Sequence, residues 1–140
     1  MSLFKIFDIA GSGMSAQSLR LNATASNMAN AESVSSSIDK TYRARHPVFA
    51  AVMDEAIGFD EESALGGVQV LGIVESQAPL RQEYQPDHPM ADAQGYIYLP
   101  NVSIVEEMAN LISASRSYQS NVEVMNASKQ MLLQTLSLGQ

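Results

Sequence analysis

An apolar repeat of seven residues runs along each end of this 140-residue chain. The repeat near the start consists of Phe7, Met14, Leu21 and Met28, and the repeat near the end of Ile104, Leu111, Tyr118, Met125 and Leu132. Every seventh residue of an α-helix returns almost to the same face, so each repeat forms one stripe that must lie along another helix. The sequence therefore predicts two long terminal helices that pack lengthwise in a coiled-coil core.

The first helix is expected over residues 2–30, which contain no proline and are mostly Ala, Leu, Met, Ser, Gln and Asn. Gly11 and Gly13 are its weak points. Each glycine inside a helix costs up to roughly 1 kcal/mol relative to alanine. The pair either marks where the regular helix begins or lets another backbone approach closely, and we favour the close approach.

The second helix is expected to begin after Ser103, which suits the N-cap position and has capping-box spacing to Glu106. Glu106 and Glu107 then place negative charge in the first turn, where it complements the helix dipole. Nothing breaks this helix before Leu138, and Gly139 is expected to end it. Further apolar residues make its stripe wider than a two-stranded seam, namely Met108, Val122, Leu136, Val105, Ile112 and Leu133.

Between the two helices the pattern changes to that of short strands. Residues 68–74 are rich in β-branched side chains and are bounded by glycines and a proline, so they are predicted to form a strand. Residues 95–100 are a second, shorter strand candidate, and residues 46–49 are expected to begin a third extended stretch. Residues 54–67 are expected to form an exposed acidic loop.

The predicted fold class is mainly α, with a small β-containing and largely irregular middle segment. The expected parts are an N-terminal helix at residues 1–31, a serine-rich connector at 32–41, the middle segment at 42–100 and a C-terminal helix at 101–140. The two helices are expected to be marginal by themselves, because the backbone entropy of ordering them offsets most of what one narrow apolar seam contributes. Their flanks are Ala, Ser, Asn, Gln and Thr instead of the Lys and Glu that coat a solvated helix, which favours several neighbouring helices. The alternative is an antiparallel hairpin of the chain's own two ends.

Charge and composition exclude several classes of partner. The net charge is −7, and most of the acidic residues lie in the middle segment, so a phosphate backbone is an unfavourable partner and nucleic acid binding is not expected. No apolar run approaches the ~20 residues that span a bilayer, so direct membrane insertion is not expected. The first residues lack the basic flank and cleavable end of a secretory signal. The absence of cysteine excludes disulfides and thiolate metal sites.

Catalytic chemistry finds no support in the sequence. Asp87, His88 and Asp92 could be weighed as a metal site, but a catalytic zinc draws three ligands from ordered elements, and we interpret His88, like His46, as a loop histidine beside proline. The serines lack a nucleophile elbow, and no glycine loop carries the lysine of a phosphate cradle. We expect neither enzymatic activity nor a cofactor.

The stretch 19–31 ends in Asn27-Met28-Ala29-Asn30 after an alanine-rich helix. It resembles the N-terminal signature of bacterial flagellar axial proteins, the rod and hook family. Residues 67–75, 88–102, 106–126 and 136–140 resemble the rod members of that family, so the likeness covers nearly the whole chain.

The resemblance implies a structural subunit of the flagellar rod that polymerises helically with itself and with other rod proteins. It implies that the terminal helices form an inner coiled-coil tube around the export channel, next to the membrane-embedded ring of the basal body, with the middle segment outside. It also implies export through the flagellar type III apparatus, without a cleavable signal, to a rod that crosses the periplasm. Asn27 and Asn30 match the family motif and are expected to bond across helix interfaces, although Asn30 could equally cap the helix end.

A different class of function stays open at this point. A soluble adaptor or export chaperone could use a helical hairpin to hold the amphipathic segment of a partner.

Overall fold

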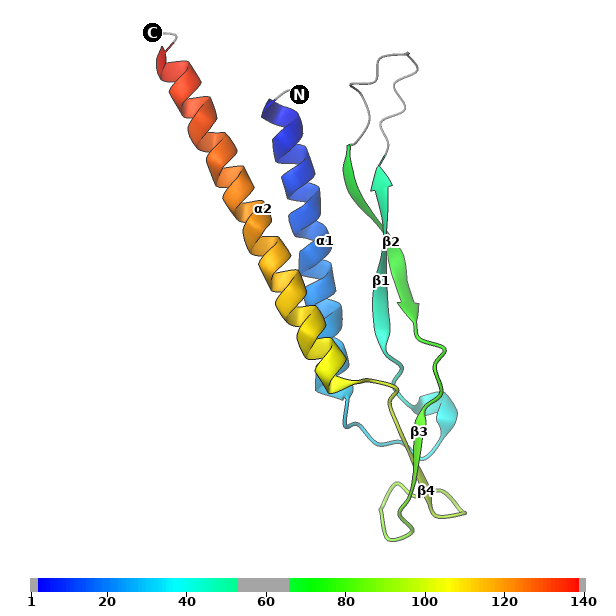
Figure 1. Cartoon of the computed structure of the whole chain (residues 1–140). Helices are drawn as coiled ribbons and strands as arrows, with labels where there is room; N and C mark the ends of the chain where they lie inside the picture. Colours follow the sequence, from blue (N-terminus) through cyan, green and yellow to red (C-terminus); the bar gives the residue numbers. More distant parts are fainter. Residues whose placement is uncertain (1–2, 53–65, 139–140) are drawn as a thin grey trace.

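The computed structural model describes residues 3–52 and 66–138. Its main elements are two long helices, α1 (Leu3–Asn30) and α2 (Ile104–Leu138). They run antiparallel, so that both termini lie at one end of an elongated molecule, and they diverge toward that end (Figure 1). The predicted terminal helices are confirmed, while the expected helix end at Gly139 lies outside the described residues.

The chain between the helices forms two antiparallel hairpins. β1 (Arg45–Val52) pairs with β2 (Gly67–Glu75), and β3 (Arg81–Tyr84) pairs with β4 (Tyr96–Leu99). The strands predicted at 68–74 and 95–100, and the extended start at 46–49, are confirmed. β3 was not predicted, because its four residues are all exposed and show no apolar alternation. The acidic loop lies almost wholly within residues 53–65, outside the described part.

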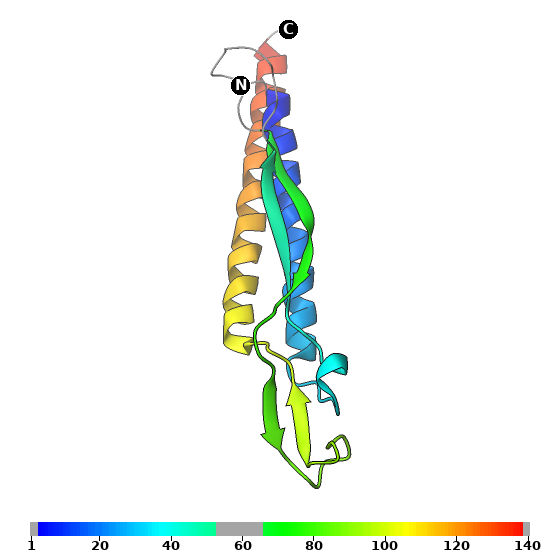
Figure 2. The same ribbon diagram turned by 90° about the vertical axis from the view of Figure 1, so that its right-hand side faces the viewer.

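The elements form three layers with α1 in the middle. α2 covers one side of α1 and the β1–β2 hairpin covers the other, while the β3–β4 hairpin extends beyond the ends of the helices (Figures 1 and 2). An isolated two-stranded hairpin is marginal in water, so β1–β2 depends on its contact with α1. At its far end the Val68 N–H donates to the Ser12 hydroxyl of α1 at 3.1 Å. Gly67 is required there, because its φ is +126° and a Cβ would lie 2.6 Å from Ser12 Oγ.

Small and polar residues take part in the contact between α1 and α2. The Arg20 guanidinium donates to Asn110 Oδ1 at 2.8 Å, and Ala114 is completely buried. A Cβ on Gly13 would lie 2.8 Å from Asn121 Nδ2, so the close neighbour at this glycine is a side chain of α2 and not the backbone that was predicted. The prediction is wrong for Gly11, where a Cβ would have no neighbour within 4 Å.

A short helical turn and backbone hydrogen bonds hold the connector between α1 and β1, although its serine-rich sequence indicates only a loop. A short 3₁₀ turn covers Ile38–Lys40, and Ser35 and Tyr98 exchange backbone hydrogen bonds of 3.0 Å in each direction. A small apolar cluster of Ala31, Ala44 and Val102, with Tyr42 against it, lies next to this bridge. The best-packed region of the described chain is therefore the junction of α1, β1 and α2, far from the termini.

Candidate assembly surfaces and the polar junction that positions them

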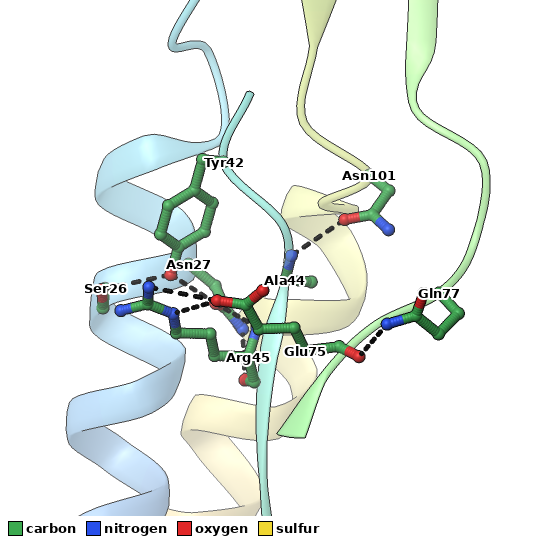
Figure 3. Close-up of polar contacts among 8 residues, drawn as sticks. All are labelled: Ser26, Asn27, Tyr42, Ala44, Arg45, Glu75, Gln77 and Asn101. Carbon is green, nitrogen blue, oxygen red and sulfur yellow. Dashed lines mark hydrogen bonds and ion pairs between the residues drawn. The ribbon is translucent and has the colours of Figure 1, made fainter. Parts of the chain in front are cut away.

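Asn27 of α1 is fully buried, and it bonds to residues of β1 and α2. Figure 3 shows it next to Tyr42 and Arg45. Its Nδ2 donates to the Arg45 carbonyl at 2.9 Å and to Glu107 Oε1 at 3.2 Å. Its Oδ1 accepts from the Arg45 N–H and from the Tyr42 hydroxyl, each at 2.9 Å. An amide offers two donors and an acceptor oxygen with two lone pairs, so these four bonds use the full capacity of the side chain.

These bonds explain why asparagine stands at this position. The amide of Asn27 satisfies both backbone groups of Arg45, as a neighbouring strand would, and so attaches the start of β1 to α1. Through Glu107 it also holds the first turn of α2. Asn27 was predicted to bond between helices, and within this chain its partners are a strand and a helix. The contact with buried Glu107 was missed, since the sequence pointed only to a helix-dipole role for that carboxylate.

A second asparagine, Asn101, holds the segment that leads into α2. Its Oδ1 accepts from the Ala44 N–H at 2.8 Å, and its Nδ2 donates to the Ala78 carbonyl at 2.9 Å and the Ser76 carbonyl at 3.3 Å. The Arg43 guanidinium donates to the same Ser76 carbonyl at 3.2 Å. No local pattern marks Asn101, because its three partners lie 23 to 57 residues away in sequence.

The surface over this junction carries one ion pair. Arg45 bridges Glu75 at 3.2 Å and lies 5.4 Å from the centre of the Tyr42 ring. Both charged side chains are about half exposed, so the pair contributes little to stability and mainly keeps Arg45 over the ring (Figure 3).

Asn30 lies at the end of α1 and bonds within its own helix. Its Nδ2 donates to the Ser26 carbonyl at 2.8 Å, and the Ser33 hydroxyl donates to the Asn30 carbonyl at 2.8 Å. Of the two alternatives for Asn30, this geometry favours the helix-end role. At the start of α2, the Glu106 N–H lies 3.5 Å from Ser103 Oγ, a long version of the predicted cap.

The large residues of the two predicted apolar stripes are not fully buried in the single chain. On α1, Phe7, Met14, Leu21 and Met28 are half-buried. On α2, Leu111, Val122, Met125 and Leu132 are half-buried, whereas Ile104, Met108, Tyr118 and Leu136 are exposed. The buried positions on the two helices are instead Ala10, Ala16, Ala23, Thr24, Asn27, Glu107, Ala114 and Ser128. A single chain thus covers its apolar stripes only in part.

α2 exposes several large apolar residues, and α1 is its main packing partner among the described elements. Val105, Ile112 and Leu133 are 78%, 54% and 55% exposed, and they carry large apolar surface into solvent. Neither described helix combines the length and hydropathy needed to cross a bilayer. Exposed apolar surface of this kind is typical of a protein interaction site.

The residues once weighed as a metal site have other roles. The Asp92 carboxylate accepts hydrogen bonds from the Tyr96 and Gln94 N–H groups and from the Tyr98 hydroxyl, so it shapes the turn before β4. The pKa of Asp92 is held below its ordinary value, chiefly by the bond from the Tyr96 N–H. The pKa of Tyr98 is raised by desolvation and by the nearby Asp92 charge. His88 Nδ1 accepts from the Met90 N–H, and no metal-binding group of three or more His, Asp or Glu residues occurs in the described ranges.

Two long terminal helices, a middle segment folded outside them and partly uncovered apolar stripes are typical of a structural protein that assembles through its helices. Residues 7–34 match the family described as flagella basal body rod protein, and residues 93–138 match the C-terminal region described for the flagellar basal body rod FlgEFG proteins.

The chain is also 54% identical to the flagellar basal-body rod protein FlgC of Salmonella typhimurium and to that of Escherichia coli O6:H1, over the full length of each. It is 44% identical over full length to FlgC of Buchnera aphidicola subsp. Schizaphis graminum. The chain therefore belongs to the family of flagellar basal-body rod proteins, and these full-length relatives are its FlgC members.

Proposed function

We propose that this protein is a structural subunit of the bacterial flagellar rod, in which its terminal helices pack among the helices of neighbouring subunits. The observation that carries the proposal is the full-length similarity to FlgC rod proteins, which includes both helices and both hairpins. In the rod, copies of this chain and related rod proteins join in a helical assembly around the export channel. The helices form the inner coiled coil, and the hairpins lie outside.

The side-chain pattern supports this arrangement. The α1–α2 contact within one chain uses Gly13, Ala114 and Asn27, which bring the two helices close together but bury little apolar area. The large residues of both stripes stay half-buried or exposed, including Leu111 and Met108. Burying these side chains against neighbouring helices supplies the stabilisation that the single chain lacks, at roughly 1.5–3 kcal/mol for each one that becomes fully covered.

The proposed route and location follow the family. The subunit passes through the flagellar type III apparatus and joins the rod in the periplasm, above the membrane-embedded ring. A chain without cysteine suits such a route, because it cannot be locked by disulfides before it passes a narrow channel.

Replacing Leu111 with glutamate tests the proposed packing. Leu111 is half-buried in the single chain, and a carboxylate in a helix seam would be desolvated without a partner. We expect Leu111→Glu protein to be exported and yet to be absent from isolated basal bodies, with loss of motility in a strain that lacks its own copy. Leu132→Glu, six residues before the end of α2, provides a second test with less effect on the junction.

Ser120→Glu is the matched control, because Ser120 is exposed and lies nine residues, or about 180°, around α2 from Leu111. Its basal bodies and motility should be normal. Normal motility with Leu111→Glu and Leu132→Glu would refute the assignment of these stripes to subunit packing. Wild-type protein found in the cytosol as a stable compact monomer, and not in basal bodies, would refute rod membership and favour the adaptor.

A further inference from the structure

A partly open pocket of about 280 Å³ is lined by residues of α1, β1 and α2. Its wall combines Arg20 and Thr24 of α1, Asn110 of α2 and the first half of β1. No acidic residue lines the pocket within the described part of the chain, although the whole chain has a net charge of −7. Hydrogen-bond donors and positive charge therefore gather here on a protein that is otherwise acidic.

Thr24 is the side chain that points most clearly to a ligand. It is only 4% exposed, yet its hydroxyl makes no hydrogen bond with another described residue. Hydroxyls inside helices commonly bond to a carbonyl one turn earlier, as Ser128 does with the Val124 carbonyl at 2.8 Å. Buried polar side-chain atoms nearly always have a partner. Because Thr24 borders the pocket, a group bound there can supply that partner.

Arg20 and Asn110 are joined to each other and keep further donors free for a ligand. The Arg20 guanidinium donates to Asn110 Oδ1 at 2.8 Å, and its other N–H groups have no bonded partner among the described residues. A guanidinium cannot accept a hydrogen bond, so the amide oxygen of Asn110 must face it and the Asn110 Nδ2 group remains a donor. The pocket thus offers a charged donor, an amide donor and a hydroxyl.

The acidic side chains closest to the pocket along the chain are engaged with other groups. Glu107, in the first turn of α2, accepts from Asn27 Nδ2 at 3.2 Å. Glu75 pairs with Arg45 at 3.2 Å, and this ion pair balances the charge of Arg45, which also lines the pocket. Of the two lining arginines, Arg20 is therefore the one whose charge can act on a ligand.

We propose that this pocket binds a carboxylate. A guanidinium beside an amide and a hydroxyl matches the two oxygens of a carboxylate, and hydrogen bonds to an ionised acceptor are the stronger kind. On β1, Pro47 and Phe49 add apolar surface beside the His46 ring, which suits the short hydrocarbon stem of an acidic group. An acidic side chain of a neighbouring protein and a small free acid are two sources of the same chemistry.

Titration of the purified protein with propionate tests the site, because propionate has a carboxylate on a short stem. Sodium chloride at equal ionic strength is the control for general salt effects. The side-chain amide signal of Asn110 and the backbone amide of Thr24 report binding in NMR spectra. We expect saturable shifts with propionate that chloride does not produce. An equal response to chloride, or no saturable shift, would refute the site, and saturation by phosphate but not by propionate would refute its assignment to a carboxylate.

Thr24→Val is the decisive variant, because Thr24 makes no side-chain bond within the described chain and valine has nearly the same shape. Loss of one hydrogen bond to an ionised group should weaken propionate binding by about tenfold. Arg20→Gln should weaken it by at least about tenfold, and Thr24→Val keeps the test valid if Arg20→Gln also loosens the helix contact.

Arg116→Gln is the matched control, since it removes the same charge from an exposed position on α2 outside the pocket. It should change propionate binding by less than about twofold, because an exposed charge is screened by solvent. If Thr24→Val and Arg20→Gln bind propionate as well as the control does, the pocket is not the binding site.

Basal bodies isolated from a strain that produces each variant in place of its own copy distinguish the two sources. If a neighbouring protein supplies the carboxylate, Thr24→Val and Arg20→Gln proteins should be exported but depleted from basal bodies, and Arg116→Gln should be present at the native level. If a free acid supplies it, all three should assemble normally. This comparison rests on the proposed function, whereas the titration does not: absence of even the native protein from basal bodies would overturn rod membership and leave the carboxylate site standing.

Discussion

Asn27→Ala should weaken the junction of α1, β1 and α2 more than any other single truncation of a polar side chain on α1. It removes four hydrogen bonds, and only the Tyr42 hydroxyl keeps another neighbour, the Ser26 hydroxyl at 3.2 Å. The N–H and carbonyl of Arg45 lose a partner in part-buried bonds, and the Glu107 carboxylate loses its partner in a buried bond. Each unsatisfied group costs about 1–3 kcal/mol, and water entering the vacated space recovers part of this, so we expect a loss of about 3 kcal/mol.

Amide hydrogen exchange of the purified protein measures this loss at a reporter that the substitution does not touch. The Ser76 N–H donates to the Ala44 carbonyl at 2.8 Å and exchanges only when the start of the hairpin opens. A loss of about 3 kcal/mol corresponds to exchange about a hundredfold faster. The Arg45 amide is unsuitable, since it loses its acceptor directly.

Asn22→Ala is the control, because Asn22 is exposed on the same helix and the change brings the same gain in helix propensity. The two variants therefore differ only in the buried bonds. If Ser76 exchanges within about threefold in both, the junction does not depend on Asn27, and the assignment of its four bonds is wrong.

Two further predictions concern the helix contact and the outer hairpin. Gly11→Ala should raise the midpoint of thermal unfolding by a few degrees, because alanine gains about 0.5–1 kcal/mol of helix propensity. Gly13→Ala should give no such gain, because its Cβ would lie 2.8 Å from Asn121 Nδ2. Equal midpoints for the two variants in circular dichroism melts would contradict the close contact at Gly13. The pKa of Asp92 is lower in the folded protein than its ordinary value of 3.8. The contribution of the Asp92 carboxylate to folding stability is therefore fully present above pH 3.8, and it is lost as the pH falls through the lower folded pKa. Amide shifts of Tyr96 should therefore stay constant down to that ordinary value and change below it, and Asp92→Asn should abolish the change; a transition at or above the ordinary value would refute the bonding of Asp92.

The sequence indicates β2, β4 and the start of β1, but it does not indicate β3. The residues at 68–74 and 96–99 are β-branched or aromatic enough to indicate strands in isolation. β3 has the sequence Arg-Gln-Glu-Tyr and becomes a strand because β4 supplies its partners, Leu99 opposite Arg81 and Tyr96 opposite Tyr84. Local composition cannot reveal a strand that forms only because a neighbouring strand pairs with it.

The seven-residue repeats and the absence of proline at both ends were enough to predict two long terminal helices, and the signature ending in Asn30 gave a resemblance to the flagellar axial proteins. These features depend on residues within a few helical turns of one another, where spacing along the chain translates directly into position on a helix face. The partners of Asn27 and Asn101, the burial of Glu107 and the use of small residues in the helix contact emerge only in three dimensions. Each of these contacts joins residues far apart in sequence. An asparagine in the sequence does not reveal whether its amide will face a helix, a strand or a neighbouring subunit.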